Sequence, residues 1–250
     1  MANIFDFKLI FTQIPAILRY LPITLEITII SYFFSMIIGF LVALIKIKQI
    51  KVLRRIAAFY VSFTRGTPII VQLYATYYGI PMLLQYCNYR FGTQFNVNAI
   101  PPIVFALVAL ALNDGAYASE SIRAAILAVE KGQIEAAQSM GMTTLQTLRR
   151  IIVPEALVVA LPSLGNSFIG MVKGTSLVFV TATVEITAGG RLMAARTFRY
   201  FEMYVSLAII YWIITMAISV ALNAWERRLR CDEAQTEADR DRNQRLEEKV

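Results

Sequence analysis

Long, mostly apolar runs are the feature that most limits what this chain can fold into. The run "LEITIISYFFSMIIGFLVALI", residues 25–45, matches the roughly 20 residues that a helix needs to cross ~30 Å of hydrocarbon. The alternating ten-residue segments typical of membrane β-barrels do not occur. Because a spanning segment must satisfy its backbone hydrogen bonds internally, the runs predict an all-α integral membrane protein.

About five such runs divide the chain into three parts. Residues 1–20 lack a cleavable signal pattern and are predicted to be an external amphipathic lead-in. Residues 21–226 hold the spans and form the transmembrane domain. Residues 227–250 are a cytoplasmic tail of mixed charge, too polar to bury a core, for which we expect a solvated helix or a docking segment. The predicted spans are residues 21–45, 56–84, 101–128, 154–172 and 204–225.

Basic residues gather beside the spans, and their positions set the predicted orientation. Residues 46–55 hold five Lys or Arg and no acidic residue, which is typical of a cytoplasmic loop. Alternation then places the N-terminus outside, and residues 129–153 and the C-terminus in the cytoplasm. One link fits this orientation poorly. Residues 173–199 are predicted to lie outside, yet they carry the basic residues Lys173, Arg191, Arg196 and Arg199.

The cytoplasmic segment 129–153 is polar, yet its pattern is helical. Apolar residues recur every three or four positions from Ile134 to Ile152, which indicates an amphipathic helix. Thr143 and Gln146 form a capping-box pattern for a new helix. Gly141 stands just before it, where one helix would end. We therefore expect two short helices joined at Gly141.

Two interpretations of this segment are open. A helix that lies on lipid usually carries Lys or Arg on its polar face and aromatic residues on the other, but residues 134–148 contain neither. Small side chains beside a glycine favour close contact with another protein, which is the interpretation we prefer. The predicted docking residues are Glu135, Ala136, Ala137, Gly141, Met142 and Thr143.

The same segment resembles a known motif, the EAA-x3-G-x9-I-x-L-P loop of bacterial ABC importer permeases. The matching positions are Glu135, Ala136, Ala137, Gly141, Ile151 and Pro154, with Val153 where the motif has Leu. The string "RGTPIIVQL", residues 65–73, and the run from residue 115 to residue 157 resemble the polar-amino-acid branch of that family. The likeness extends over roughly residues 21–229.

The resemblance implies an assembly as well as a fold. It implies the type I ABC importer permease fold, with a coupling helix in residues 129–153, in the bacterial cytoplasmic membrane. The implied partners are a dimer of ATPase subunits that binds ATP and Mg²⁺, a second permease subunit in a homodimer or similar heterodimer, and an extracytoplasmic substrate-binding protein. The implied cargo is a polar amino acid of the histidine, glutamine, arginine or cystine type. The stretch "AARTFRY", residues 194–200, resembles members associated with cystine.

The residues leave little chemistry to the chain itself. It contains no G-x-x-x-x-G-K-[ST] phosphate loop, so ATP hydrolysis is expected in a partner. It has no histidine, and its two cysteines fall on opposite sides of the predicted membrane, so no disulfide, zinc site or Cys-His nucleophile is expected. A Ser–Lys hydrolase using Lys173 is a weak alternative. No cofactor, metal or nucleic acid is expected to bind. Two rival classes are an ion-coupled carrier and a structural or signalling membrane subunit.

Polar side chains inside the spans are costly, which makes them functional candidates. Gly66 and Pro68 predict a kink in the second span, which either is structural or frees backbone groups toward a path. Glu120 and Arg123 are expected to pair with each other. Glu26 is either buried and paired or faces a path.

A polar path for a zwitterionic solute needs both donors and acceptors. Arg65 or Lys173 would neutralise a carboxylate, and Asp114 or Glu185 would hold an ammonium group. The hydroxyls of the fourth span have an alternative role, which is to bond across helices. The predicted path residues are Arg65, Thr67, Asn113, Asp114, Tyr117, Asn166, Ser167, Lys173, Thr175 and Ser176.

Overall fold

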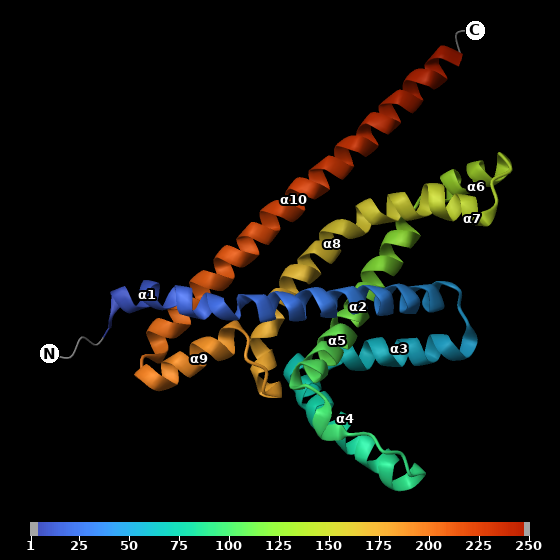
Figure 1. Ribbon diagram of the computed structural model, residues 1–250. Helices are drawn as coiled ribbons and strands as arrows, with labels where there is room; N and C mark the ends of the chain where they lie inside the picture. The colour runs from blue at the N-terminus through green and yellow to red at the C-terminus, as the bar shows by residue number, and fades with distance from the viewer. Residues whose placement is uncertain (1–4, 248–250) are drawn as a thin grey trace.

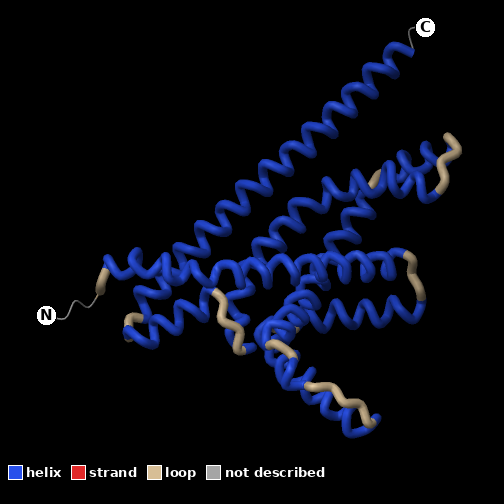
Figure 2. The backbone as a smooth tube through the Cα atoms, viewed as in Figure 1, coloured by secondary structure: helices blue, strands red, loops and turns tan. Residues whose placement is uncertain are grey.

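Helices make up nearly the whole structure, as the apolar runs require. The structure is a computed structural model that describes the backbone of residues 5–247 and the side chains as far as Arg228. No strand occurs in that part of the chain. Some of the helices cross one another, others run in roughly parallel or opposite directions, and short loops join them (Figures 1 and 2). The prediction of an all-α protein is confirmed.

Ten α-helices and four shorter helical turns follow one another along these residues. The α-helices are α1 Phe7–Ile17, α2 Leu21–Ile47, α3 Lys51–Gly66, α4 Ile69–Phe91, α5 Pro102–Ala128, α6 Lys131–Ser139, α7 Thr144–Thr147, α8 Val153–Gly174, α9 Ile186–Thr197 and α10 Tyr200–Glu247. The turns are η1 Leu18–Tyr20, η2 Val97–Ala99, the π-helical η3 Leu148–Ile152 and η4 Thr175–Thr181.

Four helical runs of the described chain are long and apolar enough to cross a membrane, by length and composition. They contain the first, third, fourth and fifth predicted spans. The runs are Phe7–Ile47, Pro102–Ala128, Thr144–Thr181 and Tyr200–Arg228.

The second predicted span, residues 56–84, is not one helix but the broken pair α3 and α4. Thr67 has φ −115° and ψ 142°, and Pro68 has φ −63° and ψ 139°. A residue before proline is pushed out of the helical region, and proline offers no N–H to continue the helix. The predicted kink is therefore a complete interruption of the helix.

The lead-in helix α1 runs on through η1 into α2, so that residues 7–47 form one helical run. Asp6 caps α1 by accepting hydrogen bonds from the backbone N–H groups of Lys8 and Leu9, at 3.0 and 3.2 Å. Ile10 and Ile17 are buried, and Ile17 packs in a cluster with residues of α9 and α10. The N-terminal helix is thus part of the packed structure.

The most extensive helix contact is α2 against α5, where small residues let the two backbones approach. A Cβ added at Gly39 would lie 2.8 Å from the Cβ of Ala118, and one at Gly115 would lie 2.9 Å from Cγ2 of Ile38. Such contacts are the usual means of helix association in membranes, where burial of apolar surface gives no driving force between helices. The α2–α5 pair therefore fixes the frame on which the other helices are placed.

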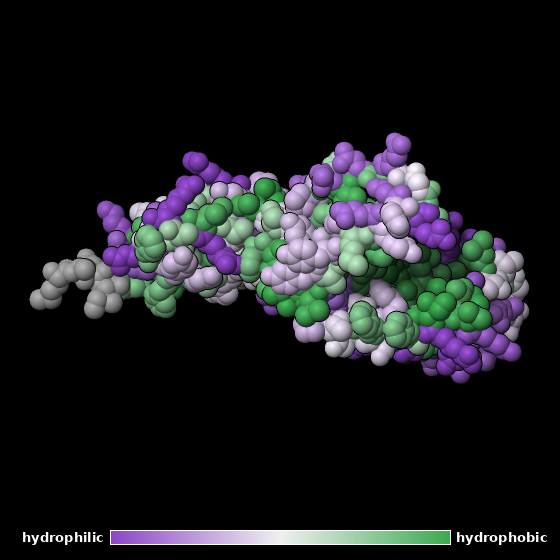
Figure 3. Space-filling view, turned by 90° about the horizontal axis from the view of Figure 1, so that it is seen from below, coloured by the Kyte–Doolittle hydropathy of each residue, from purple (hydrophilic) through white to green (hydrophobic). Residues whose placement is uncertain are grey.

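The polar parts of the molecule lie toward two ends. In Figure 1 the α2–α3 turn, the α6–α7 pair and the C-terminal end of α10 lie to the right, whereas α9 and the N-terminal end lie to the left. Figure 3 shows strongly hydrophilic groups gathered toward the two ends of one face, with hydrophobic groups over much of the surface between them.

We predict that Gly115→Val destabilises the protein by overpacking the α2–α5 contact, by about 1–3 kcal/mol. The matched control is Gly79→Val, because nothing lies within 4 Å of a Cβ at Gly79. Thermal unfolding in detergent should show a lower Tm for the first variant and a nearly unchanged one for the second. Equal Tm values would contradict the close α2–α5 approach.

Candidate functional site

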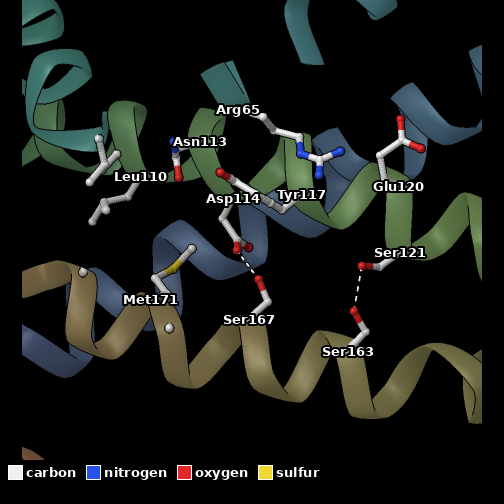
Figure 4. A pocket seen from close by; sticks show the side chains of 13 residues that line it. Arg65, Leu110, Asn113, Asp114, Tyr117, Glu120, Ser121, Ser163, Ser167 and Met171 are labelled. Carbon is white, nitrogen blue, oxygen red and sulfur yellow. Dashed lines mark hydrogen bonds between the residues drawn. The ribbon is translucent and has the colours of Figure 1, made fainter. Parts of the chain in front are cut away.

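A cavity of about 530 Å³ lies between facing stripes of α5 and α8, beside the break between α3 and α4 (Figure 4). The lining positions on each helix recur at helical spacing, so they share one face. The lining residues are Leu110, Asn113, Asp114, Tyr117, Glu120 and Ser121 of α5; Ser163, Ser167, Gly170, Met171 and Gly174 of α8; Arg65 of α3; and Ile69 of α4.

The carboxylate of Asp114 is the central polar group of this cavity. Its side chain lies where α2, α5 and α8 meet, with only 9% of the residue exposed. Ser35 of α2 donates a hydrogen bond to Oδ2 at 2.7 Å, and Ser167 of α8 donates to Oδ1. No Lys or Arg of the described chain pairs with it. A buried carboxylate held by hydroxyls alone is a site at which a cationic group of a solute would find an acidic partner.

Arg65 supplies the opposite charge to the same cavity. It lies in the last turn of α3, and its Cζ is 5.1 Å from the centroid of the Tyr117 ring, a cation–π contact. No carboxylate pairs with it among the residues that the structure describes. The cavity thus presents one acid and one base that are not paired with each other.

The side chain of Gln72 holds the break between α3 and α4 in place. Its Nε2 donates to the carbonyl oxygens of Thr64 and Thr67, at 2.8 and 3.1 Å, and to Oγ1 of Thr67 at 2.8 Å. Its Oε1 accepts from Nδ2 of Asn113 at 3.1 Å. Thr67 therefore supports the break and does not line the cavity. The prediction missed Gln72, although a lone amide in the apolar start of α4 was a usable signal.

An ion-pair cluster lies at one end of the cavity, where Glu120 lines it (Figure 4). The predicted pair is confirmed, since Nη2 of Arg123 is 2.9 Å from Oε2 of Glu120. Lys46 at the end of α2 also pairs with Glu120, which the sequence did not indicate. Ser121 and Ser163 share a hydrogen bond of 2.8 Å across α5 and α8. Glu120 is thus neutralised by protein partners, unlike Asp114.

Five predicted path residues, Arg65, Asn113, Asp114, Tyr117 and Ser167, line the cavity. Asn166 lies instead on another face of α8, in a small cleft against Ser219 and Asn223 of α10. Since successive helix positions turn by about 100°, neighbours in sequence point to different sides. The predicted residues outside the cavity are Thr67, Asn166, Lys173, Thr175 and Ser176.

The other acidic candidates lie away from the cavity as well. Glu185 is fully buried and caps α9 by accepting from the backbone N–H groups of Thr187 and Ala188, at 2.8 and 2.9 Å, and from the Tyr211 hydroxyl at 3.1 Å. Glu26 is exposed on α2. The structure gives Glu185 a capping role in place of the predicted ammonium contact.

The α6–α7 segment has the predicted two-helix form, which we call the elbow (residues 131–147). The amide of Met142 donates to the carbonyl of Ala137 at 3.1 Å, and that of Gly141 to the carbonyl of Gln138 at 3.0 Å. Gly141 has φ +80°. These are the bonds of a Schellman motif, in which the left-handed residue is usually glycine. Gly141 is thus required by the backbone itself.

The second helix of the elbow begins with the predicted capping box. The Thr143 amide donates to the Gln146 side chain at 2.8 Å, and the Gln146 amide to Oγ1 of Thr143 at 3.3 Å. Met140 and Leu145 are 85% and 72% exposed, and neither was among the predicted docking residues. Of the predicted docking residues, Glu135, Ala136, Gly141 and Thr143 are exposed, Met142 is half-buried and Ala137 is buried.

Membrane-length helices, a polar cavity between them and an exposed, tightly folded elbow between two spans define a membrane transport component. The chain belongs to the family described as binding-protein-dependent transport system inner membrane component, whose model matches residues 35–230. It is therefore a multi-pass inner-membrane protein.

Named relatives and a solved structure cover nearly the whole chain. The probable amino-acid permease protein YxeN of Bacillus subtilis (strain 168) is 37% identical over 91% of this chain and 97% of its own length. The L-cystine transport system permease protein TcyL of the same organism is 35% identical, over 92% and 94%. A chain in the crystal structure of an amino acid ABC transporter with histidines is 36% identical, with a TM-score of 0.75, over 90% and 99%. The type I ABC importer permease fold predicted from the sequence is confirmed.

We predict that a cysteine at Ser163 reacts with a water-soluble maleimide, because the thiolate needed for the reaction forms in a wet cavity. A cysteine at Met216, which is 49% exposed on α10, should react far more slowly, because hydrocarbon does not support the thiolate. Both are made with Cys87 and Cys231 replaced by Ser, and labelling is followed by mass spectrometry. Equal labelling rates would contradict a water-filled cavity.

Proposed function

We propose that this chain is the permease subunit of an ATP-driven importer that moves a polar amino acid across the cytoplasmic membrane. The N-terminus lies outside and the C-terminus in the cytoplasm. ATP and Mg²⁺ bind a separate dimer of ATPase subunits, and this chain binds no cofactor and catalyses no reaction. A second permease subunit, either another copy or a similar chain, completes the path, and a binding protein delivers the solute from outside.

The observation that carries this proposal is the elbow. Its Schellman bonds and capping box fix its shape, while Met140 and Leu145 remain outside the packed structure. Exposed apolar side chains on a rigid, otherwise polar element mark a protein contact. The α2–α3 turn, rich in Lys and Arg, lies toward the same end in Figure 1, which supports a cytoplasmic position by the positive-inside rule.

A continuous helical run connects the elbow to the cavity. The run Thr144–Thr181 contains α7, the π-turn η3, α8 and η4. Ser163 and Ser167 therefore lie on the same helical run as α7, the second helix of the elbow. Movement of the elbow by an ATPase subunit would therefore shift one wall of the cavity against α5. That shift would change the side of the membrane to which the cavity opens, which couples two distinct sites.

The charges of the cavity support a zwitterionic cargo. Asp114 provides an anion for an α-ammonium group, and Arg65 provides a planar cation that suits an α-carboxylate. Lys173 and Glu185, the other pair considered from the sequence, do not line the cavity. Among polar amino acids we propose L-cystine as the first to test, because TcyL is named for its transport.

We predict that Arg65→Gln lowers kcat/KM for amino-acid uptake more than about tenfold, since a carboxylate loses its bidentate partner. Arg65→Lys should recover only part of the loss, because an ammonium group lacks the guanidinium fork. Lys173→Gln removes the same charge from a residue outside the cavity and should stay within about twofold of wild type. Uptake of labelled cystine and glutamine is measured in vesicles that contain the complete transporter. A larger loss for Lys173→Gln would place the carboxylate contact elsewhere.

We predict that Gly141→Asp leaves the protein in the membrane but uncouples ATP hydrolysis from uptake, because a residue with a side chain strains the left-handed conformation and reshapes the elbow. Gly132→Asp is the control, since Gly132 also has open space around it but no positive φ. Solute-stimulated ATPase activity and uptake are measured together in vesicles, with ATP and with a proton gradient alone. Normal uptake by Gly141→Asp would reject the docking assignment. Uptake driven by the proton gradient alone would instead favour an ion-coupled carrier.

A further inference from the structure

Helix α9 carries an exposed basic surface at the end of the molecule opposite the elbow. We call it the α9 basic face and define it as Arg191, Leu192, Arg196 and Phe198. Both arginines are exposed, and neither pairs with a carboxylate among the described residues. Leu192 is 49% and Phe198 83% exposed. The surface therefore combines unpaired positive charge with apolar groups.

In the proposed orientation, the α9 basic face lies on the side of the membrane where positive charge is not expected. Twelve residues of helix are about 18 Å long, too short to cross the membrane. In Figure 1, α9 lies beside the start of α10, away from the elbow, so in the proposed orientation it is extracytoplasmic. Basic residues are disfavoured on that side. A specific ligand on that side would account for their presence.

The face is held rigidly by the helices beneath it. A Cβ at Gly189 would overlap the ring of Tyr20, and one at Gly190 would lie 2.9 Å from Cδ1 of Leu207, so α9 sits directly on η1 and α10. The buried carboxylate of Glu185 caps its N-terminus. A preformed surface loses little conformational entropy when a partner binds.

Arg191 connects the face to the cavity. Its Cζ lies 4.0 Å from the centroid of the Phe179 ring, and Phe179 belongs to η4, which directly follows the cavity-lining Gly174. The ring restrains the position of the guanidinium, whose N–H groups can still donate to a carboxylate. A partner bound at Arg191 would therefore act, through Phe179, on η4, the segment that follows the cavity-lining helix α8.

We propose that the α9 basic face docks an acidic surface of the substrate-binding protein, with Phe198 in an apolar recess beside it. This rests on the proposed function and its orientation. Arginine edges suit carboxylates in bidentate pairs, and the family is defined by dependence on a binding protein. Anionic lipid headgroups are the competing occupant. A binding protein is favoured because Arg191 is fixed over an aromatic ring, whereas a lipid contact requires only mobile basic side chains at the interface.

The test uses the complete transporter in nanodiscs of neutral lipid, with ATPase activity measured against the concentration of amino-acid-loaded binding protein. Arg191→Glu with Arg196→Glu should raise the half-saturating concentration about tenfold and flatten its dependence on salt, since steering by opposite charge is lost. The maximal rate should stay unchanged. Arg191→Gln with Arg196→Gln should raise the half-saturating concentration by about threefold. This milder variant keeps the test informative if charge reversal impairs folding.

The matched control is Arg227→Glu with Arg228→Glu, an equal change of charge on exposed residues of α10, at the end of its membrane-length run Tyr200–Arg228 that lies away from α9. An unchanged half-saturating concentration in the α9 variant, or an equal shift in the control, would overturn the proposal. If the α9 variant alone loses a response of wild-type activity to added anionic lipid, at unchanged half-saturation, the face binds lipid and the proposal is wrong. A wild-type transporter that the binding protein does not stimulate would instead refute the proposed function, and this inference with it.

Discussion

The junction of α2, α5 and α8 depends on the burial of one carboxylate, that of Asp114, at membrane depth. Asp114 can be buried there because Ser35 of α2 and Ser167 of α8 donate to its two oxygens. Ser35 can reach it because Gly39 and Gly115 let α2 and α5 pack in near-backbone contact. An ionised group in hydrocarbon would otherwise cost several kcal/mol. The packing of three helices and the presence of a polar cavity are therefore two consequences of the same requirement.

The charged residues around the cavity fall into two groups, those paired with another residue of the protein and those free to contact a solute. Glu120 is neutralised by Lys46 and Arg123, so it contributes to the joint between α2 and α5. Asp114 and Arg65 face the cavity without such partners. A site that leaves one acid and one base unpaired is suited to a solute that carries both charges, because binding then compensates the protein as well as the solute.

Local sequence patterns predicted local structure well. The capping box at Thr143, the left-handed Gly141 and the interruption before Pro68 all depend on a few consecutive residues, and all are present. Apolar length predicted four of the spans. The second span was predicted as one span with a local kink at "RGTP", and the structure divides it there into two separate helices. Gln72, which stabilises that interruption, bonds to residues of both α3 and α5 and was missed.

The sequence by itself determined that the chain is a helical membrane protein, where its elbow bends and which family motif it carries, because hydrophobicity, capping and backbone restrictions act within one or two turns. Only the tertiary structure decided which polar residues share a cavity. Asn166 and Ser167 are adjacent in sequence, yet Ser167 contacts Asp114 while Asn166 faces α10. Helix rotation and crossing are set by the packing of distant residues such as Gly39 against Ala118. Contacts of that kind join residues far apart in sequence, so no local pattern records them.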